Sequence, residues 1–138
     1  MKVYISGRIS GNEKFYRDDF NWVEEQLKDL KDIEAVNPLK YDEKIEEKEW
    51  LEFLKMDIDI LKNCDAIILI NGNLPLHKST SWKKSYGARI ERLVAKKYGL
   101  MIFYGWKHFR KWYEKEYRYN INVRKNNDKS FEHTLLKK

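Results

Sequence analysis

The sequence predicts a three-layer α/β fold with a mostly parallel sheet of four to five strands, followed by a basic, aromatic C-terminal extension. Two observations carry this prediction. Short β-branched and aromatic segments alternate with segments of helical periodicity as far as residue 104, an order typical of parallel sheets with helices on both faces. Residues 65–70 are also apolar after the first position, without alternation, as in a central strand covered on both sides.

The N-terminal part contains two of the expected strands and one helix. We expect the first strand at residues 2–6, and the loop that follows, residues 7–12, contains two glycines and a serine. In residues 13–31 apolar side chains recur at steps of three and four, which predicts a helix with one buried face. A second strand at residues 33–36 is stopped by Pro38.

The central part continues the same alternation. A helix is expected at residues 46–62, and the central strand follows at residues 65–70. The next helix spans residues 86–98, with Ser85 placed to cap its first turn. A last strand at residues 100–104 completes the sheet.

The charge of the chain divides at the end of this pattern. Residues 1–104 contain 18 Lys and Arg against 18 Asp and Glu, whereas residues 105–138 contain 10 against 4. We therefore expect a neutral domain and an appended basic extension with these boundaries. Aromatic residues recur in the extension at helical spacing: Trp106, Phe109, Tyr113 and Tyr117. The extension could hold a nucleotide, bind nucleic acid, form a dimer contact or pack as a last helix. Residues 120–130 are expected to be irregular.

Composition argues against several classes of protein. The longest apolar stretch, residues 66–70, is too short to cross a membrane, and the first strand leaves no room for a signal peptide. The single cysteine, Cys64, has no partner for an internal disulfide, and we expect it to be a buried small side chain. These features predict a cytoplasmic protein. Because His77, His108 and His133 are far apart, we expect no metal site and no cofactor.

Two acids fall on apolar helix faces. The helix at residues 46–62 has one broad apolar arc: Trp50, Phe53, Leu54, Ile58, Ile60 and Leu61. Asp57 lies near the middle of this arc, and Asp59 lies on the polar side. Glu91 lies inside the arc of the helix at residues 86–98, which contains Gly87, Ile90, Val94, Ala95 and Tyr98. Burying an ionised carboxylate is costly unless it is paired, hydrogen-bonded or used in chemistry. A functional role and a purely structural one are therefore both open.

The predicted topology brings these acids close to a binding crevice. Ligands of open α/β sheets bind beyond the carboxyl ends of the strands, where residues 6–12 and 71–85 would lie. Both loops offer hydroxyls and N–H groups for a phosphate or carboxylate, and Arg8 adds charge; ordinary strand–helix turns are the alternative. A carboxylate pair suits cleavage at an anomeric carbon, because the transition state there is oxocarbenium-like. Tyr4 could orient one carboxylate or pack in the core.

The sequence resembles the nucleoside 2-deoxyribosyltransferase-like superfamily in two segments. Residues 3–7, with Ser10 and Gly11, are similar to the opening of that superfamily. The pattern S-x-G-x-x-x-E-x-x-x-A that begins at Ser85 resembles its nucleophile segment, and Asp57 falls at the position of its catalytic aspartate. The form extended back to tryptophan is most similar to a small, largely uncharacterised branch of bacteriophages and bacteria, related to the 2′-deoxynucleoside 5′-phosphate N-hydrolases. Arg8 stands where that branch commonly has proline.

This resemblance, which covers about residues 2–104, implies a Rossmann-like fold, a homodimer or higher homo-oligomer, and a nucleoside or nucleotide ligand. The implied reaction is cleavage or transfer at the N-glycosidic bond of a (deoxy)nucleoside or its 5′-monophosphate. Glu91 would be the nucleophile, Asp57 would assist protonation or orientation, and Tyr4 would place the nucleophile. The sugar and phosphate site would contain Ser6, Gly7, Arg8, Ser10, Gly11, Trp82, Ser85 and Gly87. The alternative is a non-catalytic protein that senses or sequesters a cyclic or NAD-derived nucleotide.

Overall fold

The computed structural model of the 138-residue chain describes residues 1–41, 49–72, 74, 80–117, 120 and 123–126. Its internal contacts divide the chain into two compact units, Met1–Trp106 and Lys107–Lys138. The two units are described separately below. No helix among the described residues has the length and apolar character needed to cross a membrane.

The first unit is built on a four-stranded parallel sheet. The strands are β1 (Lys2–Ser6), β2 (Glu34–Val36), β3 (Ala66–Leu69) and β4 (Met101–Tyr104), and their order across the sheet is β2-β1-β3-β4. All three neighbouring pairs are parallel. This arrangement confirms the α/β class and the parallel sheet predicted from the sequence.

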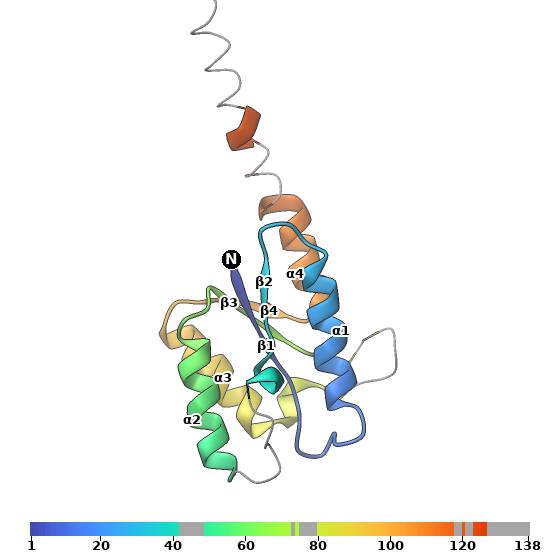
Figure 1. The fold of residues 1–138 in the computed structure, drawn as a ribbon, viewed down its shortest axis with the longest axis vertical. Helices are drawn as coiled ribbons and strands as arrows, with labels where there is room; N and C mark the ends of the chain where they lie inside the picture. Colours follow the sequence, from blue (N-terminus) through green and yellow to red (C-terminus); the bar gives the residue numbers. More distant parts are fainter. Residues whose placement is uncertain (42–48, 73, 75–79, 118–119, 121–122, 127–138) are drawn as a thin grey trace, which may run out of the picture. The chain divides into compact units, whose positions relative to one another are not determined.

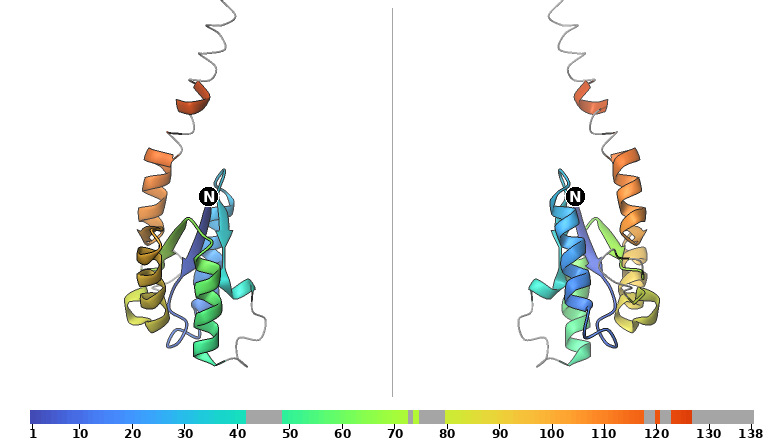
Figure 2. Two further views of the ribbon diagram at one scale, coloured as in Figure 1. Left: turned by 90° about the vertical axis from the view of Figure 1, so that its left-hand side faces the viewer. Right: turned by 90° about the vertical axis from the view of Figure 1, so that its right-hand side faces the viewer.

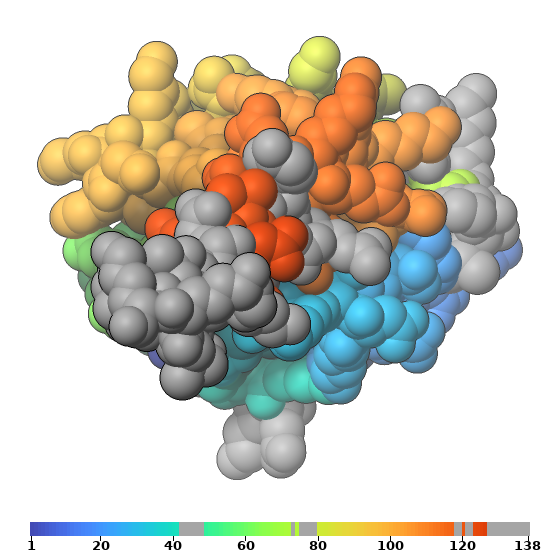
Figure 3. All heavy atoms as spheres, turned by 90° about the horizontal axis from the view of Figure 1, so that it is seen from above, coloured from blue at the N-terminus to red at the C-terminus, as the bar shows by residue number. Residues whose placement is uncertain are grey.

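Three helices cover the two faces of the sheet. Helix α1 (Tyr16–Lys28) lies on one face, whereas α2 (Trp50–Leu61) and α3 (Tyr86–Lys97) lie on the other, so the unit has three layers (Figures 1 and 2). In Figure 3 the gold-coloured second half of α3 stands at the molecular surface. The connection from β1 runs to β2 at one edge of the sheet, whereas the connection from β2 runs back past β1 to β3. Because each parallel crossover is right-handed, these opposite directions place α1 and α2 on opposite faces.

This change of direction places a crevice between β1 and β3. The two strands end at the same level, since Ser6 pairs with Leu69 and the N–H of Ile70 donates to the Ser6 carbonyl at 2.8 Å. Beyond that point the chain leaves β1 toward α1 and leaves β3 toward α3, on opposite faces. Diverging connections of this kind leave the space in which ligands of open α/β sheets bind.

The core lies around β1 and β3. Every residue of β3 and the last four residues of β1 are buried, as expected for central strands. Cys64 belongs to the cluster of buried residues beside Tyr4 and Leu61, which confirms that the lone thiol is a core side chain. Burial raises the pKa of Cys64 to about 11, so the thiol stays protonated.

Helix α2 differs from the prediction. Of the expected apolar arc only Leu54 and Leu61 are buried, and Trp50 is 48% exposed. The predicted helix started at residue 46, and residues 46–48 lie outside the described part of the chain. Asp57 is consequently half-buried, not buried. The periodicity correctly predicted an amphipathic helix, but it could not show that the cavity described below lies against much of the apolar face.

Helix α3 also shows one correction. Its buried side consists of Ala88, Glu91 and Ala95, so the prediction that Glu91 lies on an inward face is confirmed. Tyr98 was expected on the same face, but it is 51% exposed. It follows the last helical residue, Lys97, and is therefore no longer directed by the helical repeat.

The helical segment expected from the aromatic spacing starts at Trp106, the last residue of the first unit, and continues in the second. Helix α4 (Trp106–Trp112) continues into a π-helical turn (Tyr113–Tyr117), and within it the rings of Trp112 and Tyr117 lie 5.4 Å apart. His108 is exposed, whereas His77 and His133 lie outside the described residues. Residues 120 and 123–126 are helical, against the irregular structure expected there, and the rest of residues 120–130 lies outside the described part.

Candidate functional site

A cavity of about 570 Å³ lies beyond the carboxyl ends of β1 and β3. Its walls come from four segments: the loop after β1, the turn at residues 38–39, α2 as far as Asp57, and the residues from Lys84 to Glu91. Its lining residues are Gly7, Arg8, Ile9, Ser10, Gly11, Pro38, Leu39, Trp50, Phe53, Leu54, Asp57, Lys84, Ser85, Tyr86, Gly87, Ala88 and Glu91. Eight of the eleven residues proposed from the sequence line this cavity.

Glu91 reaches the cavity from the second turn of α3. The helix starts at Tyr86 because the Ser85 hydroxyl accepts a hydrogen bond from the N–H of Ala88 at 3.1 Å, an N-cap that satisfies one otherwise free donor. The small side chains of Ala88 and Ala95 allow this side of α3 to approach the sheet closely. Glu91 is carried inward with them and is only 6% exposed.

Strand β1 holds the Glu91 carboxylate at both oxygens. The Tyr4 hydroxyl donates a short hydrogen bond to Oε2, and the Ser6 hydroxyl donates to Oε1 at 3.0 Å. Tyr4 and Ser6 are two residues apart, so they point to the same face of the sheet. Tyr4 therefore does both things considered for it: it packs in the core and orients a carboxylate.

The electrostatic surroundings favour the protonated form of Glu91. Burial, followed by repulsion from the Asp57 carboxylate, raises the pKa of Glu91 to about 8, although the hydrogen bonds from Tyr4 and Ser6 lower it. Burial also raises the pKa of Tyr4 well above its usual range, so the phenol remains a donor. In the empty cavity Glu91 is thus largely neutral at neutral pH, and a nearby positive charge would favour its ionisation.

The loop after β1 is held by its own contacts. Arg8 donates from Nε to the Ser10 carbonyl at 2.9 Å, and the Gly11 N–H donates to Glu13 at 2.9 Å. Gly11 has a φ of +82°, and a Cβ there would fall 2.3 Å from a guanidinium nitrogen of Arg8. Only glycine suits both the backbone conformation and the space. The loop thereby keeps the positive charge of Arg8 at the cavity.

Cationic and N–H groups line part of the cavity. Lys84 lines it together with Arg8, and the first turn of α3 adds the partial positive charge of a helix N-terminus. The sequence analysis proposed Arg8 and Ser85 but missed Lys84, because a lysine beside a cap is common on any solvated helix. These groups suit an anionic group such as a phosphate.

Aromatic and apolar residues form another part of the wall. Trp50 and Phe53 come from α2, and Tyr86 comes from α3. A Cβ on Gly87 would lie 4.0 Å from Nε1 of Trp50, which shows that the two helices approach closely here. The sequence analysis placed Trp50 and Phe53 on an apolar arc without assigning them to the site. Flat apolar surfaces of this type stack well on the ring of a base.

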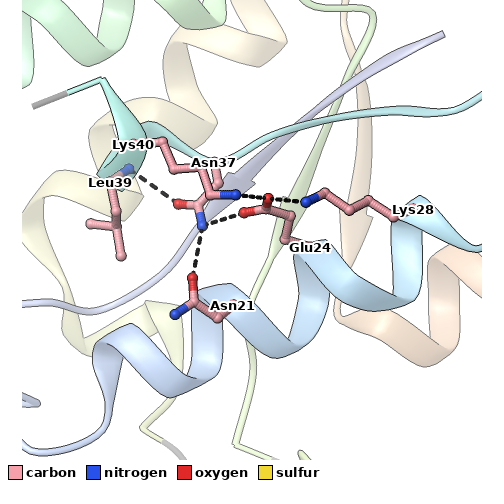
Figure 4. A network of polar contacts seen from close by, with 6 residues as sticks. All are labelled: Asn21, Glu24, Lys28, Asn37, Leu39 and Lys40. Atoms are coloured by element: carbon pink, nitrogen blue, oxygen red, sulfur yellow. Dashed lines mark hydrogen bonds and ion pairs between the residues drawn. The ribbon is translucent and has the colours of Figure 1, made fainter.

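A polar network supports the remaining apolar wall. Asn37 is 3% exposed, and its side chain caps the short 3₁₀ turn η1 (Pro38–Lys40) by accepting from the N–H of Leu39 at 3.1 Å. The Asn37 amide also donates to Glu24 at 2.7 Å, and Lys40 pairs with the same carboxylate (Figure 4). Lys28 forms a third contact with it, at 3.0 Å. These contacts lower the pKa of Glu24 against the opposing effect of burial, and they fix the turn that carries Pro38 and Leu39.

Three proposed residues do not line the cavity. Tyr4 and Ser6 lie beneath it and hold Glu91. Trp82, proposed as a substrate contact, is 7% exposed and belongs to the buried core, where its N–H donates to the Ile70 carbonyl at 2.8 Å. It is part of the short helix η3 (Trp82–Lys84) that leads into α3, so it positions the segment that contains the site and makes no part of the cavity wall.

The site contains carboxylates but no cluster of metal ligands. Among the described residues, no group of three or more His, Cys, Asp and Glu side chains is close enough to hold a metal ion. The chemistry that these residues can supply is that of a buried carboxylate, a second carboxylate across the cavity and an anion-binding set of groups.

Comparison with known proteins shows which family the chain belongs to. Residues 1–104 match the family model described as "Domain of unknown function (DUF4406)". The chain belongs to the DUF4406 family. A search of curated proteins found no match. A similar fold occurs in the solved structure of a "2-desoxiribosyltransferase from Leishmania mexicana", with a TM-score of 0.53 and 20% sequence identity over 74% of this chain.

The deoxyribosyltransferase structure supports the fold expected from the sequence motifs. The DUF4406 chain spans 61% of the length of that protein. The relation to a phage and bacterial branch, and to N-hydrolases of nucleotides, remains a prediction.

Proposed function

We propose that this protein cleaves or transfers the N-glycosidic bond of a (deoxy)nucleoside or its 5′-monophosphate. The observation that carries the proposal is the Glu91 carboxylate, buried at the cavity and held at both oxygens by Tyr4 and Ser6. A carboxylate fixed in this way can be aimed at one carbon of a bound ligand, and such alignment is a large part of catalysis.

The reaction begins with ionised Glu91. One carboxylate oxygen bonds to C1′ of the sugar while the bond from C1′ to the base nitrogen breaks. The electron pair leaves with the base, which takes up a proton from water or through Asp57. Water or a second base then displaces the carboxylate from C1′. Asp57 lines the same cavity, where its charge would stabilise the oxocarbenium-like transition state or orient the sugar.

Two sets of lining residues suit different parts of the ligand. Arg8, Lys84 and the N–H groups at the start of α3 suit a 5′-phosphate. Trp50, Phe53 and Tyr86 offer rings for stacking with the base. The sugar then lies between them, over Glu91. A 5′-phosphate can pair with these two cations, whereas a free nucleoside cannot. We therefore expect the monophosphate to be preferred.

The first experiment is chromatography of a panel of ribo- and deoxyribonucleosides and their 5′-monophosphates after incubation with the protein. Free base should appear with the wild type and should fall by about 10³-fold or more in Glu91→Gln, as is typical when a nucleophile is removed. Asp57→Asn should slow the reaction by a smaller factor. Asp59→Asn is the matched control, because Asp59 lies exposed on the same helix outside the cavity, and it should keep full activity. An active Glu91→Gln protein would disprove the proposed role.

A non-catalytic nucleotide-binding protein is the second candidate. The raised pKa of Glu91 favours it, since a neutral carboxyl group is a poor nucleophile and a good hydrogen-bond donor to a ligand. This candidate predicts that a cyclic or NAD-derived nucleotide binds tightly and is recovered unchanged, with no free base from any member of the panel. Release of base that depends on Glu91 would rule it out.

A further inference from the structure

The outer side of α3 carries a row of positive charge that the cavity does not use. Its buried side is formed by Ala88, Glu91 and Ala95, with Val94 partly buried against the core, whereas the opposite side is exposed or partly exposed. Five cations on or just before the helix lie there and are defined as the α3 basic face: Lys83, Arg89, Arg92, Lys96 and Lys97. The only acid in residues 82–97 is Glu91, which points the other way.

This charge is not neutralised locally. Between described residues, none of the ion pairs includes a member of the α3 basic face. Residues 1–104 are neutral as a whole because acids gather elsewhere in the sequence, for example eight acids against three cations in residues 42–59. The charge of the domain is thus segregated, and a segregated charge of one sign attracts a partner of the opposite sign.

Aromatic rings are interleaved with these cations. A surface groove of about 500 Å³ is lined by Trp82, Lys83, Arg89, Arg92 and Leu93. The Arg92 guanidinium lies 5.8 Å from the ring centre of Trp82 and 5.9 Å from that of Tyr104, and its Nε donates to the Tyr104 hydroxyl at 3.1 Å. Tyr104 is therefore held in place, yet 41% of it is exposed.

One further exposed ring lies at the end of this surface. Tyr98 is 51% exposed just after α3, and the Lys62 and Lys97 ammonium groups lie 5.2 and 6.0 Å from its ring centre. The intervening side chains of α3 reach the surface, as the gold spheres of Figure 3 show for the second half of the helix. The row of cations is thus accompanied by two exposed tyrosine rings, Tyr98 and Tyr104.

We propose that the α3 basic face binds single-stranded nucleic acid. Several cations on one face match the repeated phosphates of a polynucleotide. Exposed tyrosine rings provide surfaces on which unpaired bases can stack, whereas the bases of a duplex are already stacked inside it. An acidic protein would match the charge but would leave the open rings without a role. The inference does not depend on the proposed glycosidic chemistry, because none of the five cations lines the cavity that contains Glu91.

The test is fluorescence anisotropy of a labelled oligothymidine of about twenty nucleotides, long enough to cover such a surface, with the full chain. A triple variant, Lys83→Gln, Arg89→Gln and Lys96→Gln, is compared with a second one that removes the same charge from the C-terminal extension. The control substitutions are Lys107→Gln, Lys111→Gln and Lys115→Gln, all at exposed positions. Circular dichroism checks that both proteins are folded.

We expect binding by the wild type that weakens steeply with salt. The α3 variant should lose at least about 10-fold in affinity, and the slope of log K against log salt should fall by about 2, for three phosphate contacts on a single strand. The control variant should lose less than about 3-fold. No binding by the wild type, or a loss confined to the control variant, would overturn the proposal.

A separate substitution tests the single-strand assignment. Tyr104→Leu should weaken binding of oligothymidine by roughly 5-fold or more, as loss of one stacked base does, with little change in the salt slope. A duplex of the same length should bind more weakly than the single strand. Equal affinity of the Tyr104→Leu protein, or stronger binding of the duplex, would overturn the assignment.

Discussion

The contact between Tyr4 and Glu91 joins the centre of the sheet to the candidate reaction site. Tyr4 is completely buried on β1, and its hydroxyl donates to a carboxylate that itself is almost inaccessible. The pKa values of both groups are raised, so the Tyr4 phenol stays protonated and the protonated form of Glu91 is favoured. Two predictions follow at the scale of single residues.

The first concerns the dependence of stability on pH. The folded protein raises the pKa of Glu91 above its unfolded value, so the folded state binds the extra proton between about pH 4.5 and 8, and stability falls as the pH rises through this window. Glu91→Gln removes this loss of stability, because glutamine does not ionise. The free energy of unfolding of the variant, relative to the wild type, should therefore increase by about 3.5 kcal/mol between pH 5 and pH 8. Urea unfolding at both pH values measures it, and a variant that becomes relatively less stable as the pH rises would contradict it.

The second prediction concerns Tyr4→Phe. Loss of the phenol removes a hydrogen bond that lowers the pKa of Glu91, so this pKa should rise and the increase of activity with pH should move to more alkaline values. Carbon NMR of the labelled Glu91 carboxyl group follows the titration without requiring turnover. Tyr16→Phe is the control, because Tyr16 is also buried but lies on α1 away from the cavity. An unchanged titration of Glu91 in Tyr4→Phe would show that the hydroxyl does not act through Glu91, and a shift to lower pH would contradict the expected direction.

Among the elements, the turn η1 is held in its conformation by the side chain of Asn37. Asn37 caps the turn and donates to buried Glu24, so Asn37→Ala leaves both a free N–H and a carboxylate with one partner fewer. The expected loss is about 1–3 kcal/mol of unfolding free energy. Asn21→Ala is the matched control, since Asn21 is exposed and only accepts a 3.3 Å contact from Asn37, and it should lose less than about 0.5 kcal/mol. Urea unfolding of both variants decides it, and equal losses would refute the role of Asn37 in capping the turn.

The elements also show how far sequence reasoning reached. Strands β1 and β3, and the helix with Glu91, were predictable because their patterns are local: an apolar run for a central strand, and a serine cap before a helix. Helix α2 was predicted with too much burial, since the sequence does not show which part of an apolar face lies against a cavity. For the same reason Trp50 and Tyr86 were not assigned to the site, because the wall they form exists only where α2 and α3 approach each other.

The candidate site was partly predictable for a different reason. Asp57 and Glu91 are detectable as acids at positions where helical periodicity expects apolar side chains, and a residue that violates local rules often has a function. Trp82 does not violate the local pattern in this way. It fitted a motif, but whether a tryptophan faces a ligand or the core depends on the path of the chain between β3 and α3, which the motif does not contain.

At the scale of the whole molecule, ligand binding should appear as stability. A nucleoside 5′-monophosphate at about 100 times its Kd should stabilise Glu91→Gln, which cannot turn it over, by about 2.7 kcal/mol, seen as a rise of several degrees in Tm. The corresponding nucleoside at the same concentration should give a smaller rise, because it cannot use Arg8 and Lys84. Calorimetry measures both. In the background of Glu91→Gln, Arg8→Ala should reduce the difference between the two ligands, and an undiminished difference would place the phosphate elsewhere.

The position of Cys64 gives the protein an internal reporter of its own opening. It is the single cysteine of the chain, it is 8% exposed beside Tyr4 and Leu61, and its pKa is raised to about 11. Alkylating reagents need an accessible thiolate, so modification of the native protein requires opening of the core around Cys64. When reclosing is fast, the alkylation rate divided by that of a free thiol gives the equilibrium for this opening, just before the start of β3. The effect of any ligand on the core can thus be followed without introducing a probe.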